Sequence, residues 1–217
     1  MMPLNAVLFP GMPMPLMLWE PRYLRMTEYC LRNEKPFGVV LIKDGPEVGD
    51  QVAETYGVGT TAEIAHYRDQ GDHAMIMAIG RRRFKLLDVF EQGEYPEAEI
   101  ELLQETGTGV SPDLLDDIRG LFAEEVGLIL QLLGFQETEM EIPAQADKLS
   151  YMIAAHLRVS LDAKQSLLEI EHCSQRLACE LDLVRKEREE YRMLLAAQKF
   201  AEQWSDTDES SSVFSDN

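Results

Sequence analysis

The chain has 217 residues, of which 45% are hydrophobic and 27% are charged, and these values are typical of a globular protein. They exclude a wholly disordered chain, a collagen-like fibre and a disulfide scaffold. With 20 Lys and Arg residues against 39 Asp and Glu residues, the formal net charge is −19 at pH 7, which disfavours nucleic acid and anionic membranes as partners.

The compartment can be predicted from the cysteines and from the N-terminal segment. Three cysteines are an odd and sparse set, which indicates a reducing environment. Residues 1–19 carry no charge, but they lack a basic start and contain four prolines, unlike a signal peptide. No run of about 18 uninterrupted apolar residues is present. We therefore expect a cytoplasmic protein without a membrane span.

The first hundred residues have the pattern of short strands separated by turns, with one helical candidate at 21–33. The expected strands cover residues 37–43, 57–68, 73–79, 82–90 and 98–104. Gly80 is taken to separate the third strand from the fourth, and 69–72 is taken to form a hairpin turn. This pattern predicts an antiparallel barrel or sandwich.

The pattern becomes helical after residue 106. Ser111 and Ser160 are expected to cap two helices, and another helix is expected over about 146–157. A long last helix carries a heptad seam that is interrupted by Arg188, and it fits a bundle core better than a dimeric coiled coil. We therefore divide the chain into a β-rich part (1–105), a helical bundle (106–200) and a disordered acidic tail (201–217).

The motifs of common enzyme classes are missing from the sequence. It contains no P-loop, no Gly-x-Gly-x-x-Gly after a strand, no His-Glu-x-x-His and no paired Cys-x-x-Cys. His172, Cys173 and Cys179 come nearest to a metal-ligand set, but only two of them share a helix face. We expect no catalytic residues, no metal and no cofactor.

Two groups of residues are candidates for binding. An apolar segment contains Met12, Met14, Met17 and Trp19, and exposed methionines would form an adaptable patch for varied unfolded segments. The alternative is that these side chains fill the barrel core. The second group is the basic strand with Arg81, Arg82, Arg83 and Lys85, which either contacts RNA or another ligand or is a solvated strand paired with glutamates.

Several motifs resemble the N-terminal domain of Lon proteases. At the start these are Val7-Leu8-Phe9-Pro10-Gly11 and Glu20-Pro21-Arg22-Tyr23, followed by Gly80-x-x-Arg83-Phe84 and Ala155-His156-Leu157. The similarity extends over about residues 3–200. For the motif residues we expect scaffold roles: Pro10 and Gly11 form a rigid turn, Pro21 begins a helix, Arg22 pairs with Glu20, and Phe9 and Tyr23 belong to the same scaffold.

This resemblance implies an α+β fold, in which a PUA-like antiparallel pseudo-barrel is followed by a helical bundle with a long last helix. It also implies a free-standing bacterial protein without the ATPase and Ser-Lys peptidase domains of Lon, and therefore no enzyme. The expected function is a protein-binding module that captures unfolded polypeptides or acts as an adaptor or regulator of proteolysis, with a protease or adaptor as partner. The alternative is a PUA-like ligand or RNA binder that uses the strand from Arg81 to Lys85.

Overall fold

The structure is a computed structural model, and it describes residues 1–47, 53–90, 93–135 and 140–212. Within these residues the N-terminal part forms one six-stranded sheet and a helix. In chain order its elements are β1 (Met2–Leu4), β2 (Pro13–Leu18), α1 (Pro21–Asn33), β3 (Phe37–Asp44), β4 (Glu54–Asp69), β5 (Ala74–Phe90) and β6 (Glu97–Leu102). The C-terminal part contains α2 (Pro112–Leu132), α3 (Ala146–His156), α4 (Leu161–Glu169) and α5 (Cys173–Ser212).

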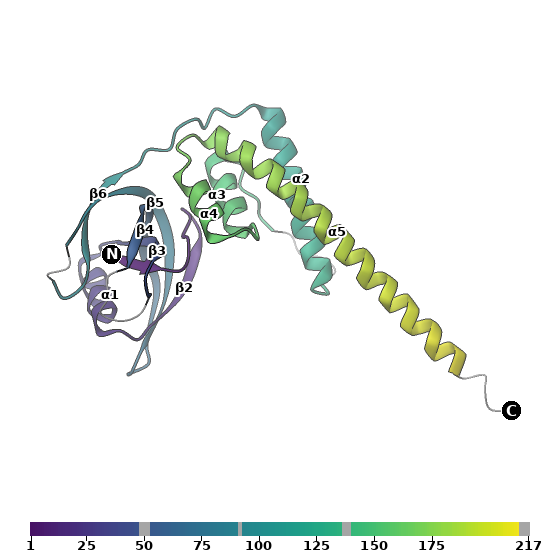
Figure 1. The fold of residues 1–217 in the computed structure, drawn as a ribbon, viewed down its shortest axis with the longest axis horizontal. Helices are drawn as coiled ribbons and strands as arrows, with labels where there is room; N and C mark the ends of the chain where they lie inside the picture. Colours follow the sequence, from purple (N-terminus) through teal and green to yellow (C-terminus); the bar gives the residue numbers. More distant parts are fainter. Residues whose placement is uncertain (48–52, 91–92, 136–139, 213–217) are drawn as a thin grey trace.

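The sheet curls into a barrel-like shape around a core of its own (Figure 1). Its strand order is β1-β3-β4-β5-β2, and β6 also pairs with β5. The long strand β5 uses one edge twice, because its first half pairs with β2 and its second half pairs with β6. Neighbouring strands are antiparallel except β1 and β3, which run parallel. The structure therefore has the expected mixed α+β architecture with a barrel-like sheet.

Two expectations about the strands were wrong. β1 and β2 lie in the proline-containing segment for which no strand was expected, and Gly80 lies inside one continuous strand, β5. A Cβ atom at Gly80 would lie 2.3 Å from the Phe9 carbonyl oxygen, so the glycine permits a close approach of two backbones. It is a contact point and not a strand break.

The helices begin where the local signals predict. The Ser111 and Ser160 hydroxyls accept hydrogen bonds from the Leu114 and Ala163 amides, at 3.3 and 3.2 Å, and so cap α2 and α4. Figure 1 shows α2, α3 and α4 gathered around the first half of α5, which then extends away from the rest of the molecule. α5 is helical through Ser212, whereas a disordered tail was expected from residue 201. The helix can continue there because adding a turn to an existing helix costs little free energy. Residues 213–217 lie outside the described part.

The buried line of α5 differs from the predicted seam at two positions. Leu177, Val184, Tyr191 and Leu195 are buried as expected. Glu180 and Glu187 are also buried, whereas the predicted seam residues beside them, Leu181 and Arg188, are only half-buried. The Arg188 guanidinium pairs with Glu124 of α2 at 3.1 Å, at the side of the interface.

The N-terminal motif connects the barrel to the bundle. Leu8 packs in the barrel core, whereas Phe9 packs in the core of the helices, where its ring centroid lies 6.4 Å from that of Tyr151. The Thr60 hydroxyl donates a hydrogen bond to the Leu8 carbonyl at 2.6 Å, and the Gly11 amide donates to the Gly80 carbonyl at 2.8 Å. Two adjacent residues therefore belong to two different cores.

Candidate functional site

The outer side of β2 carries apolar side chains that the barrel core does not use. Side chains alternate along a strand, so Met14, Leu16 and Leu18 face inward while Pro15 and Met17 face outward. Met17 is 52% exposed. Met14 packs against the barrel core, so for this methionine the alternative of a core side chain is the correct one.

Strand pairing places a second methionine beside Met17. Met17 pairs with Met75 of β5, and Pro15 pairs with Met77. Met75 is 43% exposed, and its partner on β4, Arg68, is also exposed. These side chains line a shallow pocket of about 490 Å³. We call its outward-facing side chains the methionine face: Pro15, Met17, His66, Arg68, Met75 and Met77.

The free edge of β2 has few hydrogen-bond donors. The Met12 carbonyl accepts from the Gly80 amide at 3.0 Å, so the even-numbered residues of β2 direct their backbone groups toward β5. The odd-numbered residues face the free edge, and Pro13 and Pro15 have no N–H to donate. Addition of another strand at this edge is therefore disfavoured. The Met17 amide is the one β2 backbone donor at this edge, so we expect a ligand of this region to bind mainly through the side chains.

The four predicted residues of the apolar segment have different environments. Trp19 is 54% exposed, and its ring stacks on that of His73, with centroids 4.2 Å apart, next to the β4–β5 hairpin. Met12 is half-buried and packs against both cores. Only Met17 and Trp19 are therefore well exposed, and Met75 and Arg68 are the neighbours that sequence reasoning missed.

Of the four cations of the predicted basic strand, Arg83 is buried and the other three are exposed. The Arg83 guanidinium donates to the Leu168 and Ile170 carbonyls, at 2.8 and 2.7 Å, where the barrel meets the bundle. Arg81 pairs with Glu63 at 2.8 Å, while Arg82 and Lys85 are exposed. Arg81, Arg82 and Arg83 line one pocket beside Glu105 and Asp147, whereas Lys85 does not, so the four cations do not form a single exposed basic strip.

Arg83 belongs to a polar cluster between the two halves, which we call the junction. Glu105 accepts from Arg83 at 3.2 Å and from Arg176 of α5 at 2.8 Å, and it also accepts from the Tyr151 hydroxyl. Arg176 donates further to Ser150 at 2.7 Å. Burial strongly raises the pKa of Tyr151 above its ordinary value, so the hydroxyl remains a donor. The junction holds the two halves in one orientation.

The junction extends to a third buried acid. The Ser150 hydroxyl donates to Glu180 at 2.9 Å, and burial raises the pKa of Glu180 to about 8. The heptad pattern alone could not identify these residues, because the buried positions 176 and 180 carry charged side chains.

The motif around α1 is held together by local contacts. Glu20 precedes the helix and pairs with Arg22 at 2.8 Å, and the Arg22 guanidinium carbon lies 4.7 Å from the centroid of the Tyr23 ring. Pro21 occupies the first turn of α1, where a missing N–H costs nothing. Tyr23 is buried against the barrel core.

The metal-ligating side chain types are scattered over the fold. Within the described ranges, no group of three or more His, Cys, Asp or Glu side chains is arranged to hold a metal ion. Cys173 is buried and Cys179 is exposed, so they do not form a pair. In the same ranges, none of the helices has the length and apolar character needed to cross a bilayer.

Comparison with known proteins gives a consistent family. Residues 1–186 match the model of the ATP-dependent protease La (LON) substrate-binding domain. A Lon protease from Anaeromyxobacter dehalogenans is 28% identical over 198 residues, which cover 85% of this chain and 22% of that protein. Protein cereblon from Gallus gallus is 25% identical, over 83% of this chain and 52% of that protein. The chain thus spans only 22% of the length of that Lon protease.

Solved structures agree on the fold. The Lon N-terminal domain protein from Xanthomonas campestris has a TM-score of 0.62 and 24% identity, covering 83% of this chain and 94% of that one. The N-terminal domain of Lon protease from the Mycobacterium avium complex has a TM-score of 0.56 and 16% identity, with the same coverage. The barrel-like sheet, the helical bundle and the match over residues 1–186 together place this chain in the Lon substrate-binding domain family.

Proposed function

We propose that this chain is a non-enzymatic module that holds extended, apolar polypeptide segments on the methionine face and acts as an adaptor or regulator of proteolysis. The observation that carries the proposal is the pair of exposed methionines, Met17 and Met75, side by side on neighbouring strands. Flexible, polarizable methionine side chains adapt to apolar partners of different shape. Membership in the Lon substrate-binding domain family supports a polypeptide as the ligand.

The donor-poor edge of β2 sharpens the expected binding mode. Because Pro13 and Pro15 cannot donate backbone hydrogen bonds, the bound segment contributes apolar side chains and not a paired strand. Binding through side chains alone tolerates many sequences, which suits a module for varied unfolded clients.

The first test is a binding measurement with a defined probe. The probe is a fluorescein-labelled, unstructured peptide with Leu, Phe and Val at alternating positions, and affinity is read by fluorescence anisotropy. Burying the exposed halves of two methionine side chains stabilises a complex by roughly 1.5–3 kcal/mol, so Met17→Ser with Met75→Ser is expected to weaken binding at least about tenfold. The matched control is Met193→Ser with Leu194→Ser on the exposed side of α5. Equal affinities for the two double variants would refute the methionine face as the binding site.

The adaptor role needs a separate test. A purified bacterial Lon protease is mixed with an unfolded client protein, and loss of the client is followed by gel electrophoresis with and without this chain. We expect the wild-type chain to change the rate of degradation and the Met17→Ser/Met75→Ser variant to leave it unchanged. A chain that binds the peptide but has no effect on degradation would leave a binding module without an adaptor role.

A further inference from the structure

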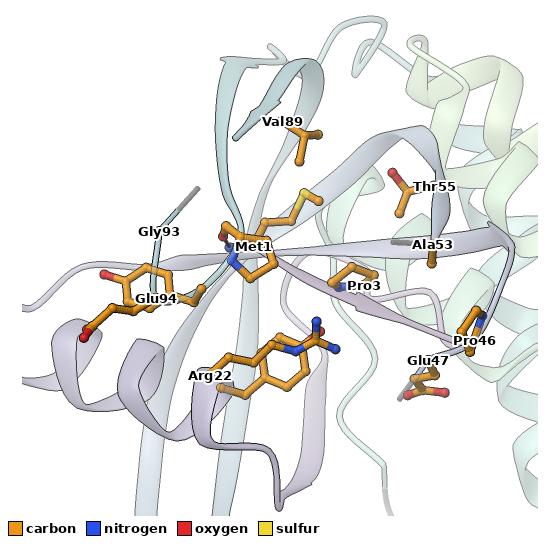
Figure 2. A pocket seen from close by; sticks show the side chains of 13 residues that line it. Met1, Pro3, Arg22, Pro46, Glu47, Ala53, Thr55, Val89, Gly93 and Glu94 are labelled. Carbon is orange, nitrogen blue, oxygen red and sulfur yellow. Dashed lines mark hydrogen bonds between the residues drawn. The ribbon is translucent and has the colours of Figure 1, made fainter. Parts of the chain in front are cut away.

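A second cavity, of about 360 Å³, lies on the barrel beside β1 and the start of α1 (Figure 2). Its volume is within the range of ligand pockets in proteins. Prolines from three separate segments line it, namely Pro3, Pro46 and Pro96, together with Ala53 and Val89. Proline rings are rigid and apolar, so this wall is formed before a ligand arrives.

One side of the cavity is polar and is built by the Glu20–Tyr23 motif. In Figure 2 the Arg22 guanidinium points into the space between Pro3 and Glu47. Arg22 is held there by Glu20 and by the Tyr23 ring, but its Nε is buried without a hydrogen-bond acceptor. Among the described residues, nothing pairs with the Tyr23 hydroxyl either. The terminal nitrogens of the Arg22 guanidinium, whose side chain is 26% exposed, and the Tyr23 hydroxyl can donate hydrogen bonds, which fits the carbonyl oxygens of a polypeptide backbone.

The charge balance of the cavity is acidic. Glu47 and Glu94 line it, and the guanidinium of Arg22 is already compensated by Glu20. Burial lowers the pKa of the Met1 amino group, which also lines the cavity, to about 6, so this group adds little positive charge at pH 7. Glu47 accepts one hydrogen bond from Asn5 at 2.7 Å, which orients the carboxylate without neutralising it. The net charge of the whole chain, −19, adds to this local field. A free carboxylate would be repelled, whereas a cationic side chain would be attracted.

We propose that this cavity is a second polypeptide subsite, which takes one apolar side chain that is flanked in the client by Lys or Arg. The apolar side chain fills the proline-lined space, the backbone carbonyls accept from Arg22 and Tyr23, and the flanking cations lie beside Glu47 and Glu94. This inference rests on the proposed function, since it names the class of segment that the same module selects. The methionine face then supplies adaptable apolar contact, and this cavity supplies the preference for basic sequence.

Three labelled peptides test the subsite by fluorescence anisotropy with the full chain. The first is Gly-Ser-Lys-Lys-Leu-Lys-Lys-Ser-Gly, the second replaces every Lys by Glu, and the third replaces Leu by Ser. We expect the first peptide to bind at least about tenfold more tightly than either of the others, because it alone offers both the apolar group and the cations. Equal binding of the first and third peptides would overturn the proposal, since the cavity would then play no part.

Variants separate the cavity from the general field of an acidic protein. Glu47→Gln with Glu94→Gln is expected to lower the affinity for the basic peptide by about threefold or more. Val89→Trp fills the cavity and is expected to abolish binding of this peptide. The matched control removes two exposed acids of α2, Asp113→Asn with Asp117→Asn, and is expected to retain the affinity. Equal weakening in both double variants would show that only net charge attracts the peptide.

A failure of this cavity as a subsite can be distinguished from a failure of the methionine face as a binding site. The Met17→Ser/Met75→Ser variant is measured against the basic peptide and against the Leu/Phe/Val probe in parallel. If this variant no longer binds the probe but still binds the basic peptide, the two ligands use separate subsites. Binding of the Leu/Phe/Val probe by Val89→Trp shows that this variant is folded, and binding of the basic peptide by the same variant would overturn the cavity as its subsite.

Discussion

The junction and the methionine face distribute charge and apolar surface in opposite ways. At the junction, charged groups such as Arg83 and Arg176 are buried, and main-chain carbonyls and Glu105 satisfy them. On the methionine face, Met17 and Met75 are exposed to solvent, although the next residue on each strand is buried in the barrel core. Buried charge requires every partner to be in place, whereas exposed apolar surface constrains the fold very little. The comparison separates residues that hold the fold from residues available for binding.

The largest effect is expected from removal of a junction cation. Arg83→Met leaves Glu105 with one cation fewer and the Leu168 and Ile170 carbonyls without this donor. Breaking a buried charge pair in this way costs roughly 3–5 kcal/mol, so the urea midpoint of unfolding is expected to fall sharply. The exposed neighbour provides the control, because Arg82→Met is expected to change the unfolding free energy by less than about 0.5 kcal/mol. Similar losses for both variants would contradict the assignment of Arg83 to the junction.

The next effect depends on pH and concerns the interface between α2 and α5. Burial, and secondarily the nearby Glu187, raise the pKa of Glu125 from 4.5 to about 7. The folded-state pKa lies above the unfolded value, so the protonated acid stabilises the fold below pH 4.5 and this stability is lost as the pH rises through 7. At about 1.4 kcal/mol per pKa unit, the contribution is of the order of 3 kcal/mol.

Glu125→Gln is therefore expected to flatten the fall in unfolding free energy between about pH 5 and pH 8, measured by urea denaturation. Asp117→Asn, an exposed position on the same helix, is the control and is expected to leave the pH dependence as it is. A wild-type chain that is equally stable at both pH values would contradict the buried, protonated acid.

A smaller effect tests the backbone contact that joins the two cores. Gly80→Ala would place a Cβ atom 2.3 Å from the Phe9 carbonyl oxygen, so the N-terminal motif has to shift. Overpacking of this kind costs roughly 1–3 kcal/mol, and the thermal midpoint is expected to fall accordingly. A Cβ atom at Gly57, also within the sheet, would meet nothing within 4 Å. Gly57→Ala is expected to leave the thermal midpoint nearly unchanged, and an equal loss there would remove the special role of Gly80.

The smallest effect on stability is expected on the methionine face itself. Met17→Ala changes an exposed side chain and is expected to alter the unfolding free energy by less than about 0.5 kcal/mol. Its neighbour Leu18 is only 4% exposed, so Leu18→Ala is expected to cost roughly 2–5 kcal/mol. Chemical denaturation of both variants checks this difference. A large loss for Met17→Ala would mean that the methionine is part of the packed structure and not a binding residue.

Local signals predicted the elements whose formation depends on neighbours in the chain. The structure has α1 at 21–33 as expected, because Pro21 presets the first turn and the apolar residues follow helical spacing. The strands β1 and β2 escaped prediction because their partners are remote: Met2 pairs with Val39, and Met17 pairs with Met75. Prolines in such a segment are typical of a loop. They are tolerated in β2 because the pairing directs the backbone nitrogens of Pro13 and Pro15 toward the free edge, where no hydrogen bond is needed.

The candidate site illustrates the same limit. The alternation of side chains along a strand predicted that Arg82 and Arg83 lie on opposite faces. It could not predict which face would be covered, since Arg83 is buried by Leu168 and Ile170, more than eighty positions further along the chain. The sequence by itself determined the helix caps, the strand periodicity and the family. Only the tertiary structure decided which methionines and arginines are exposed, because burial depends on contacts between segments that are distant in the chain.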